Sequence, residues 1–273
     1  MSEPTRTPRT RLCRYTTHAV RYRDADLVGE LIGKSDFVDV FLRQTLGRVP
    51  TPAQRRIVDA VLVTLMEHGM TPSAIAARLV YASSPEALQA GVAAGLLAVA
   101  SRFVGTMEPA AALLARIAEA GADGPAEARR IALAYRERRE PVPGFGHHLH
   151  RPDDPRAAAL LGLAREVDSH GAHCAALAML ATAVDEACGR HVTINATGAV
   201  AAVLGDIGIP VALMRGFAVL SRAAGLIAHL AEEQHDPSGR FIWDLVDRTM
   251  SVDDPADPTH PTPPGAFAKP SVR

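Results

Sequence analysis

Apolar residues recur at helical spacing along most of the chain, and capping residues followed by proline mark where the helices begin. After Thr51-Pro52, the apolar residues at positions 57, 61, 62, 65 and 66 share one helix face, and Gln54 completes a capping box with Thr51. The same cap-then-proline pair recurs at residues 71–72, 84–85 and 154–155. Further helices are expected at residues 85–103, 108–120, 126–138, 155–168, 171–188, 198–207 and 211–234. Because no segment alternates with period two for long enough to predict a sheet, the sequence predicts an all-α fold of about nine or ten helices.

Composition narrows the class of protein. Apolar residues make up 48% of the 273 residues but aromatic residues only 4%, so the core is expected to consist of aliphatic side chains and alanine. A net charge of −1 provides no cationic surface for nucleic acid. No apolar run reaches the length of about 18 residues that a membrane span needs, and the first residues do not resemble a secretory signal. Three cysteines without metal-ligand spacing predict reduced thiols, and hence a cytoplasmic protein.

The segment at residues 144–156, GFGHHLHRPDDPR, carries the clearest chemical signal. His147 follows two glycines, which allow the backbone to approach a ligand closely and direct the imidazole into a cleft. Arg156 lies in the first turn of the helix that Asp154 caps, where a cation opposes the helix dipole and so indicates an anionic partner outside the helix. A surface loop with chance histidines would show the same spacing.

This segment is similar to the signature of the citrate synthase superfamily, and departs from it at Leu149, where Val or Ile is usual. Further stretches, in the same order, resemble other landmarks of that superfamily: residues 26–33, 67–69 with 73–78, 195–198, 221–229 and 239–244. The layout is most similar to the branch that contains the citryl-CoA lyases and the carboxy-terminal part of ATP-citrate lyase.

The resemblance implies a helical fold of two domains. The small domain is expected at residues 105–208, and the large domain at residues 11–104 and 209–250. Residues 1–10 and the proline-rich tail at 251–273 are expected to be disordered or to lie on a partner.

The resemblance also implies a role for each matching residue. His147 matches the histidine that moves a proton at the oxygen on the carbon where the bond forms or breaks. Carboxylates of the substrate would be bound by His68, Arg156, Arg222 and Arg240. Coenzyme A would be bound by Arg151, which matches an arginine that meets the diphosphate, together with Gly144 and Gly146.

Two positions depart from the superfamily pattern. Thr197 stands in the stretch NATG, where the enolising aspartate is expected, and its hydroxyl cannot act as a base near neutral pH. Val104 stands where citrate synthases have another catalytic histidine, which the lyase branch also lacks. Glu108 could substitute for the missing carboxylate, although a solvated glutamate at a helix start is the alternative.

Other readings of the polar residues are simpler. The histidines at 147, 148, 150, 170 and 173 could suggest a metal site, but carboxylates at matching spacing are missing, so no metal is predicted. His229 and Glu232 are expected to face solvent or an interface. Trp243 either anchors the tail or belongs, with Arg240, to a segment that reaches the site of a neighbouring subunit.

The sequence therefore predicts an enzyme of the citryl-CoA lyase type, which cleaves or forms the carbon–carbon bond between acetyl-CoA and a 2-oxo acid such as oxaloacetate. The alternatives are an acyltransferase of the citrate synthase type and, because of Thr197, a catalytically impaired protein that binds CoA and dicarboxylates. The CoA thioester is a substrate, and no metal or redox cofactor is expected. The expected partners are a second copy of the chain and small acyl-CoA, dicarboxylate and tricarboxylate molecules, with no nucleic acid and no membrane.

Overall fold

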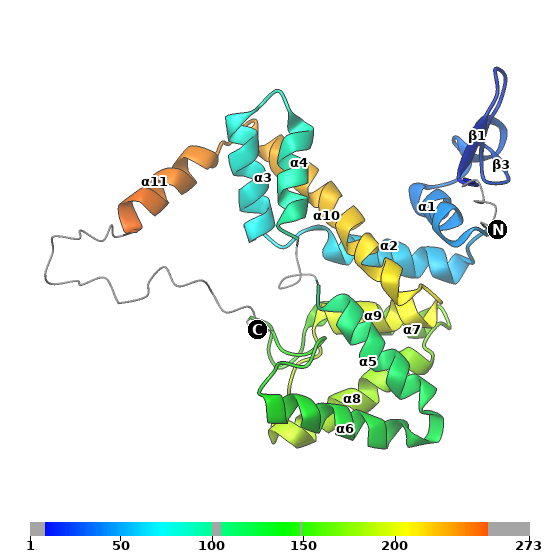
Figure 1. Ribbon diagram of the computed structural model, residues 1–273, viewed down its shortest axis with the longest axis vertical. Coiled ribbons are helices and arrows are strands. Elements are labelled where there is room, and N and C mark those ends of the chain that lie inside the picture. Colours follow the sequence, from blue (N-terminus) through cyan, green and yellow to red (C-terminus); the bar gives the residue numbers. More distant parts are fainter. Residues whose placement is uncertain (1–8, 100–104, 148, 251–273) are drawn as a thin grey trace, which may run out of the picture. The chain divides into compact units, whose positions relative to one another are not determined.

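A computed structural model describes residues 9–99, 105–147 and 149–250 (Figure 1). Helices dominate these residues, which confirms the predicted all-α class. The chain divides into two compact units, unit 1 with Met1–Gly69 and Leu96–Gly225, and unit 2 with Met70–Gly95 and Leu226–Arg273. The predicted small domain at residues 105–208 lies wholly within unit 1, and its boundaries stay a prediction. Val104, His148, the tail and residues 1–8 lie outside the described residues.

Unit 1 contains a small antiparallel sheet and is otherwise helical. The strands pair in the order β1-β2-β3, and they are β1 (Cys13–Tyr15), β2 (Val20–Tyr22) and β3 (Ala25–Asp26). The helical elements are η1 (Leu27–Leu31), α1 (Phe37–Leu46), α2 (Pro52–Met66), α5 (Met107–Glu119), η2 (Gly121–Asp123), α6 (Gly124–Arg138), α7 (Pro155–Glu166), α8 (Ala172–Cys188) and α9 (Ala196–Asp206). Unit 1 also includes α10 (Val211–Glu233) as far as Gly225. The expectation of no sheet was wrong here, because strands of two or three residues are too short to show alternation.

Helix α9 is the central helix of unit 1. Its residues Val200–Leu204 have no exposed surface, and α2, α5, α7 and α8 pack around it (Figure 1). The sequence ATGAVAAVLGD explains this position, because a helix that is apolar on all sides is stable only when it is surrounded. The N-terminus of this helix carries Thr197, so the central helix of the unit places a predicted site residue.

Unit 2 contains α3 (Pro72–Ser83), most of α4 (Leu88–Leu97), the last residues of α10 (Val211–Glu233) and α11 (Gly239–Thr249). Arg78 is 3% exposed and donates hydrogen bonds to Glu233 Oε2 at 2.8 Å and to His229 Nδ1 at 3.1 Å. The expectation that His229 faces solvent or an interface is therefore wrong within unit 2, because its ring accepts from a buried arginine. Glu232 does keep an exposed side chain, although it also pairs with Arg78.

The cap-then-proline signals were correct at three of the four helix starts. Thr51 and Gln54 form the capping box of α2, and Thr71 and Asp154 accept backbone hydrogen bonds at the starts of α3 and α7. The fourth pair does not begin a helix. Ser84 instead ends α3, because its amide donates to the carbonyls of residues 80 and 81, and α4 begins later, at Leu88.

By length and composition alone, α10 could cross a membrane, which the apolar-run argument from the sequence had not detected. The helix nevertheless contributes Met214, Phe217 and Ala218 to the hydrophobic core of unit 1. A core helix of a folded domain passes the same test, and these core residues account for part of the apolar character of α10.

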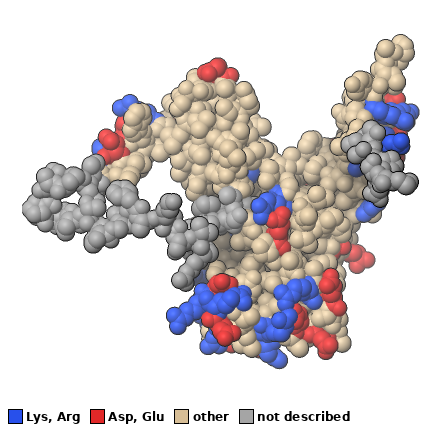
Figure 2. Space-filling model, viewed as in Figure 1, with Lys and Arg blue, Asp and Glu red and all other residues tan. Residues whose placement is uncertain are grey.

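Charged side chains of both signs lie side by side over α5 and α6 (Figure 2). Glu127 accepts from Arg116 and from Arg130, each at 2.7 Å, and Arg129 pairs with Glu186 at 3.4 Å. Mixed ion pairs of this kind are typical of a solvated surface rather than of a cationic patch that would bind nucleic acid.

The end of α9 is tied to the start of α8 by one carboxylate. Asp206 accepts hydrogen bonds from the backbone amides of Gly171, His173 and Cys174 at 2.7, 2.7 and 3.0 Å. Burial raises the pKa of Asp206, but its hydrogen bonds outweigh burial and hold that pKa well below the usual value. Burial also raises the pKa of the Cys174 thiol, which is one of three free cysteines.

We expect Asp206→Asn to lower the free energy of unfolding by about 1–3 kcal/mol at neutral pH, because an amide cannot accept at both of its heavy atoms. The lowered pKa contributes stability above the pKa of the unfolded chain, and this contribution is lost as the pH falls through the folded pKa. Chemical denaturation of both proteins at neutral and at acidic pH measures the effect. A gap in unfolding free energy that stays constant into strong acid would contradict it.

Candidate functional site

The loop at residues 144–147 is held against the segment that leads into α9. Gly146 donates its amide to the Thr193 carbonyl at 2.7 Å, and Asn195 donates its amide to the Gly144 carbonyl at 3.0 Å. The Asn195 side chain donates to the Gly146 carbonyl at 3.0 Å and caps α9 by accepting from the amide of Gly198. The stretches at residues 144–156 and 195–198, which the sequence singled out, are therefore joined by hydrogen bonds at the N-terminus of the central helix.

Two glycines allow this close approach. Gly144 has φ = +90°, and a Cβ atom on it would lie 2.9 Å from the Cα of Gly198. A Cβ atom on Gly198 would lie 2.6 Å from the Gly144 carbonyl oxygen. Gly146, with φ = +80°, also needs the left-handed conformation that favours glycine. Gly144 thus acts as a packing residue, while Gly146 lines the cavities described below.

Asp154 fixes Arg156 relative to α9. Its buried carboxylate accepts from Arg156 Nε at 3.0 Å and from Arg156 Nη2 at 2.8 Å, and it also accepts the amide of Ala196 at 3.1 Å. Burial raises the pKa of Asp154, but the hydrogen bonds with Arg156 outweigh it, so that the pKa lies below the usual value. The carboxylate therefore stays ionised and holds the guanidinium beside the residue that precedes Thr197.

His147 is half-buried, and its two ring nitrogens have different surroundings. Nδ1 accepts from the backbone amides of Leu149 and His150 at 3.1 and 3.0 Å. Nε2 lies 3.2 Å from Nη2 of Arg156. The ring of His68 lies 6.1 Å away, centroid to centroid. Because Nδ1 accepts from the backbone, a neutral ring carries its proton on Nε2, and Nε2 is the nitrogen that can exchange a proton with a ligand.

Arg222 lies on α10 with a side chain that is only 11% exposed. Its Nη1 is 3.8 Å from Oε2 of Glu67 and forms no hydrogen bond within the part of the chain that the structure describes. Burial lowers the pKa of Arg222 from its ordinary value, and Glu67 acts in the opposite direction. A buried donor of this kind gains most from an anionic ligand, since the ligand supplies the missing acceptor.

These side chains line a cavity of about 390 Å³ in unit 1. The lining includes His68, His147, Thr197, Arg156 and Arg222, which the sequence analysis had selected. The structure thus brings together five predicted residues from the turn after α2, the 144–147 loop, α7, α9 and α10. The N-terminus of α9 also faces this cavity, which favours a negatively charged ligand.

The same loop also lines a second cavity, of about 480 Å³. Arg151 lines it, as predicted, and so do Arg190 and His191, which the sequence analysis had not selected. Hydrogen bonds with Asp185 and Asp153 raise the pKa of His191 above its ordinary value. Gly146 and His147 line both cavities, so the imidazole lies where the two meet.

Glu108, Arg240 and Trp243 were also singled out in the sequence, and they line neither cavity. Glu108 forms an ion pair with Arg215 and does not line the first cavity. Arg240 belongs to unit 2, where its Nε pairs with Asp244 at 2.9 Å and its guanidinium lies over the Trp243 ring. Its role toward a neighbouring subunit stays a prediction.

Glu67 was the main omission from the candidate residues. It lines the first cavity beside His68 and faces Arg222, yet the sequence offered only its place in the stretch EHG as a signal. No periodicity or spacing links it to α10, because the contact is between segments far apart in the chain.

One group of possible metal ligands lies at the site, formed by His147, His150 and Asp154, with ligand atoms within 4.8 Å of one another. Asp154 already accepts from the Arg156 guanidinium, whose positive charge opposes a cation there. The donor set does not favour a metal, and the absence of one stays a prediction.

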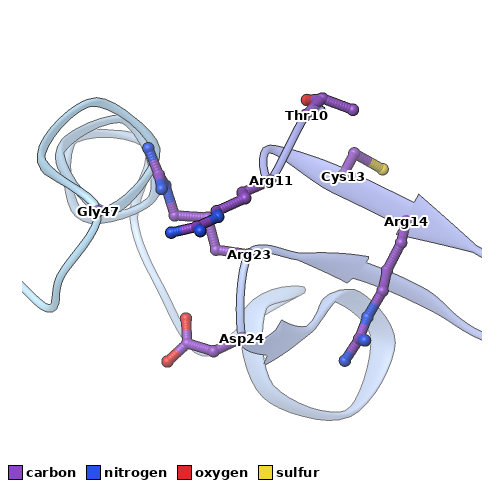
Figure 3. Close-up of a pocket in the computed structure, with 7 residues that line it drawn as sticks. All are labelled: Thr10, Arg11, Cys13, Arg14, Arg23, Asp24 and Gly47. Carbon is purple, nitrogen blue, oxygen red and sulfur yellow. The ribbon is translucent and has the colours of Figure 1, made fainter. Parts of the chain in front are cut away.

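A separate pocket of about 570 Å³ lies between β1 and the end of α1 (Figure 3). Figure 3 shows Arg11 beside Arg23, and Arg14 and Asp24 also line the pocket. Arg23 Nε donates to the Gln44 carbonyl at 2.9 Å, which places a cation at the C-terminal end of α1. This contact gives Arg23 a structural role, and no predicted site residue lines the pocket.

Comparison with known proteins agrees with the resemblance to the citrate synthase superfamily. The family described as "Citrate synthase, C-terminal domain" matches residues 10–243. The chain is 30% identical to the citryl-CoA lyase from Hydrogenobacter thermophilus, with a TM-score of 0.78 over 91% of this chain and 95% of that one. The ATP citrate lyase from Methanothrix soehngenii, solved with citrate and coenzyme A, has a TM-score of 0.73 over 93% of this chain and 43% of that one, at 18% identity, a likeness that concerns the fold alone.

Among curated proteins, the chain is 27% identical over 205 residues to the citrate synthase of Acidithiobacillus ferridurans, which covers 72% of this chain and 51% of that protein. The chain spans about half the length of the curated relatives it matches.

Proposed function

The chain belongs to the citrate synthase family, and on this premise we propose that it is an enzyme of the citryl-CoA lyase type. It would cleave citryl-CoA into acetyl-CoA and oxaloacetate, or form the same bond in reverse. The observation that carries the proposal is the meeting of two cavities at His147, because a reaction between two substrates needs one group that reaches both.

The two cavities differ in ways that suit the two substrates. The first holds Arg156, Arg222 and His68, and this set of donors is suited to the carboxylates of a small acid. The second has Arg151 and Arg190 at its wall, which can meet the phosphates of CoA. Its similarity to the H. thermophilus citryl-CoA lyase along nearly the whole of both chains supports the lyase over other activities of the family.

The chemistry assigned to His147 is proton transfer at oxygen. In the direction of synthesis, Nε2–H gives its proton to the carbonyl oxygen of oxaloacetate as the enolate carbon attacks. In cleavage, that proton returns from the tertiary hydroxyl to Nε2 while the carbon–carbon bond breaks and its electron pair passes to the acetyl thioester, which leaves as an enolate. Oxaloacetate forms at the former hydroxyl carbon. The enolate must then be protonated at carbon, a step that the hydroxyl of Thr197 is poorly suited to perform.

Thr197 is also the observation that favours a second candidate function. A protein that binds CoA and a dicarboxylate without turnover would keep both cavities and dispense with the base. We nevertheless propose an enzyme that turns over, because the backbone contacts of His147 involve only Nδ1 and leave Nε2 for proton transfer. A protein that only binds its ligands does not require such a nitrogen.

The proposal also covers the oligomeric state, the cofactors and the location of the protein. We propose a cytoplasmic homodimer that takes the CoA thioester as a substrate, with no metal or redox cofactor, no nucleic acid and no membrane as partners. Arg240 of one copy would approach the site of the other. Light scattering measures the oligomeric state.

The proposed function is tested by incubating the protein with citryl-CoA, or with acetyl-CoA and oxaloacetate, and identifying the products by mass spectrometry. A lyase interconverts these species and releases no free CoA. Release of the free thiol together with citrate would instead identify a citrate synthase. If calorimetry shows that both ligands bind but no product forms, the protein is the binding protein of the second candidate function.

A further inference from the structure

The proposed reaction needs a group that exchanges a proton with the methyl carbon of the acetyl thioester. A carboxylate is suited to this task, whereas a threonine hydroxyl is not. Within the described ranges, the residues that line the first cavity include a single carboxylate, that of Glu67. Glu108, the alternative from the sequence, is paired with Arg215 outside this lining.

The two carboxylate oxygens of Glu67 have different contacts. Oε1 accepts from the backbone amides of His68 and Gly69 at 2.8 and 2.5 Å. Oε2 lies 3.8 Å from Nη1 of Arg222, the buried guanidinium assigned to the substrate carboxylate. The carboxylate is therefore fixed to the turn after α2, with its second oxygen on the side of the substrate site.

The packing of α10 against the end of α2 sets this position. Gly225 lies one turn after Arg222, and a Cβ atom on it would lie 2.0 Å from the Met66 carbonyl oxygen and 3.2 Å from Glu67 Oε2. Only a residue without a side chain allows the end of α2 to come this close. The approach brings Glu67 and Arg222 to the same wall of the cavity.

We propose that Glu67 is the carbon acid–base group of this enzyme and performs the step that a carboxylate at position 197 would otherwise perform. This inference rests on the proposed function. In the proposed complex, the substrate carboxylate binds Nη1 of Arg222, whose ionic contact with Oε2 it shares, and the acetyl group lies against Oε2. In the free protein, the same contact keeps the buried guanidinium beside a negative charge.

The step balances without a further reactant. In the direction of synthesis, Oε2 takes a proton from the methyl group, the electron pair of that C–H bond forms the carbon–carbon double bond of the enolate, and the thioester oxygen gains the charge. The enolate carbon then attacks the carbonyl carbon of oxaloacetate, whose oxygen receives a proton from His147 Nε2. In cleavage, the protonated Glu67 returns its proton to the enolate carbon.

The test follows the exchange of the acetyl-CoA methyl protons with D2O in the presence of malate, which occupies the acid site but cannot condense. We expect Glu67→Gln to slow this exchange by about 10²–10⁴-fold at saturating ligands, since it removes a general base. Binding of CoA and of the dicarboxylate, measured by calorimetry, should persist. Glu108→Gln, a carboxylate outside the cavity, is the matched control and should exchange like the wild type.

A second variant separates a base from a positioning residue. Adding Thr197→Asp to Glu67→Gln should restore exchange by at least about tenfold, because it returns a carboxylate to the same cavity. If Glu67→Gln exchanges like the wild type at saturating malate and only binds it less tightly, Glu67 positions Arg222 and the proposal is wrong. Circular dichroism confirms that each variant is folded.

The wild type distinguishes this proposal from the proposed function. If the wild type is inert but the Thr197→Asp variant is active, the proposed lyase function stands and the proposed role of Glu67 is wrong. A wild type and a Thr197→Asp variant that both bind the ligands and both remain inert would overturn the proposed function itself, and the role of Glu67 with it.

Discussion

Replacing His147 with glutamine should reduce the rate of citryl-CoA cleavage by about 10²–10⁴-fold, the contribution typical of general acid–base catalysis. The amide can still form hydrogen bonds, but it cannot take the proton of the tertiary hydroxyl. Because the loop glycines and Asp154 hold the cavity from the backbone, binding of CoA and dicarboxylate should change far less. Steady-state kinetics and calorimetry on the same preparation measure the two effects.

His150→Gln is the matched control for this prediction. The His150 ring stacks on His147 at 4.4 Å between centroids, but its own contribution to the Nδ1 contact comes from its backbone amide, which the substitution keeps. An equal loss of rate in both variants would show that the stack, rather than proton transfer by His147, sustains turnover.

The second large effect separates the two cavities by ligand. Arg222→Ala should weaken dicarboxylate binding by about 10–150-fold, which corresponds to the loss of about 1.5–3 kcal/mol from one charge-assisted contact, and should leave CoA binding nearly unchanged. Arg151→Ala should do the reverse, because its side chain lines only the second cavity. Titration calorimetry with each ligand alone measures both constants. Equal losses for both ligands in both variants would contradict the assignment.

Arg156→Ala is also expected to weaken dicarboxylate binding more than CoA binding, but this variant is harder to interpret. Its guanidinium pairs with the buried carboxylate of Asp154, so alanine at position 156 leaves that charge without its side-chain partner. Such a loss costs about 3–5 kcal/mol at full burial, and less here because Arg156 is partly exposed. Denaturation must therefore accompany binding measurements on Arg156→Ala, whereas Arg222 leaves behind only the half-exposed Glu67.

The sequence predicted the helical class and most helix starts because both depend on local signals. Thr51 and Asp154 cap helices through atoms two or three residues away, and such contacts are visible in the sequence. The same signal failed at Ser84, whose amide was already used to end the preceding helix. The helices at Phe37–Leu46 and Gly239–Thr249 were missed. The short sheet was missed because its pairing involves too few residues to leave a periodic pattern.

The site was predictable to the extent that it lies in contiguous motifs. The resemblance selected His147, Arg156 and Thr197, and the structure places them along one cavity. Glu67 and Arg190 were not selected, since each acquires its place through a contact or a cavity wall formed by distant segments. The sequence likewise gives no sign that Gly225 matters, because its role depends on the close contact with the end of α2.

The contact between Gly144 and Gly198 constrains how this protein can vary. Each glycine excludes a side chain on the other through backbone atoms, so trimming a neighbouring side chain cannot relieve a substitution at either position. In a mutational scan, both positions should therefore reject all other residues, and no second-site suppressor within the cavity lining should rescue them. The 144–147 loop and the central helix α9 can then vary in their other side chains, while the backbone geometry that the two share stays the same.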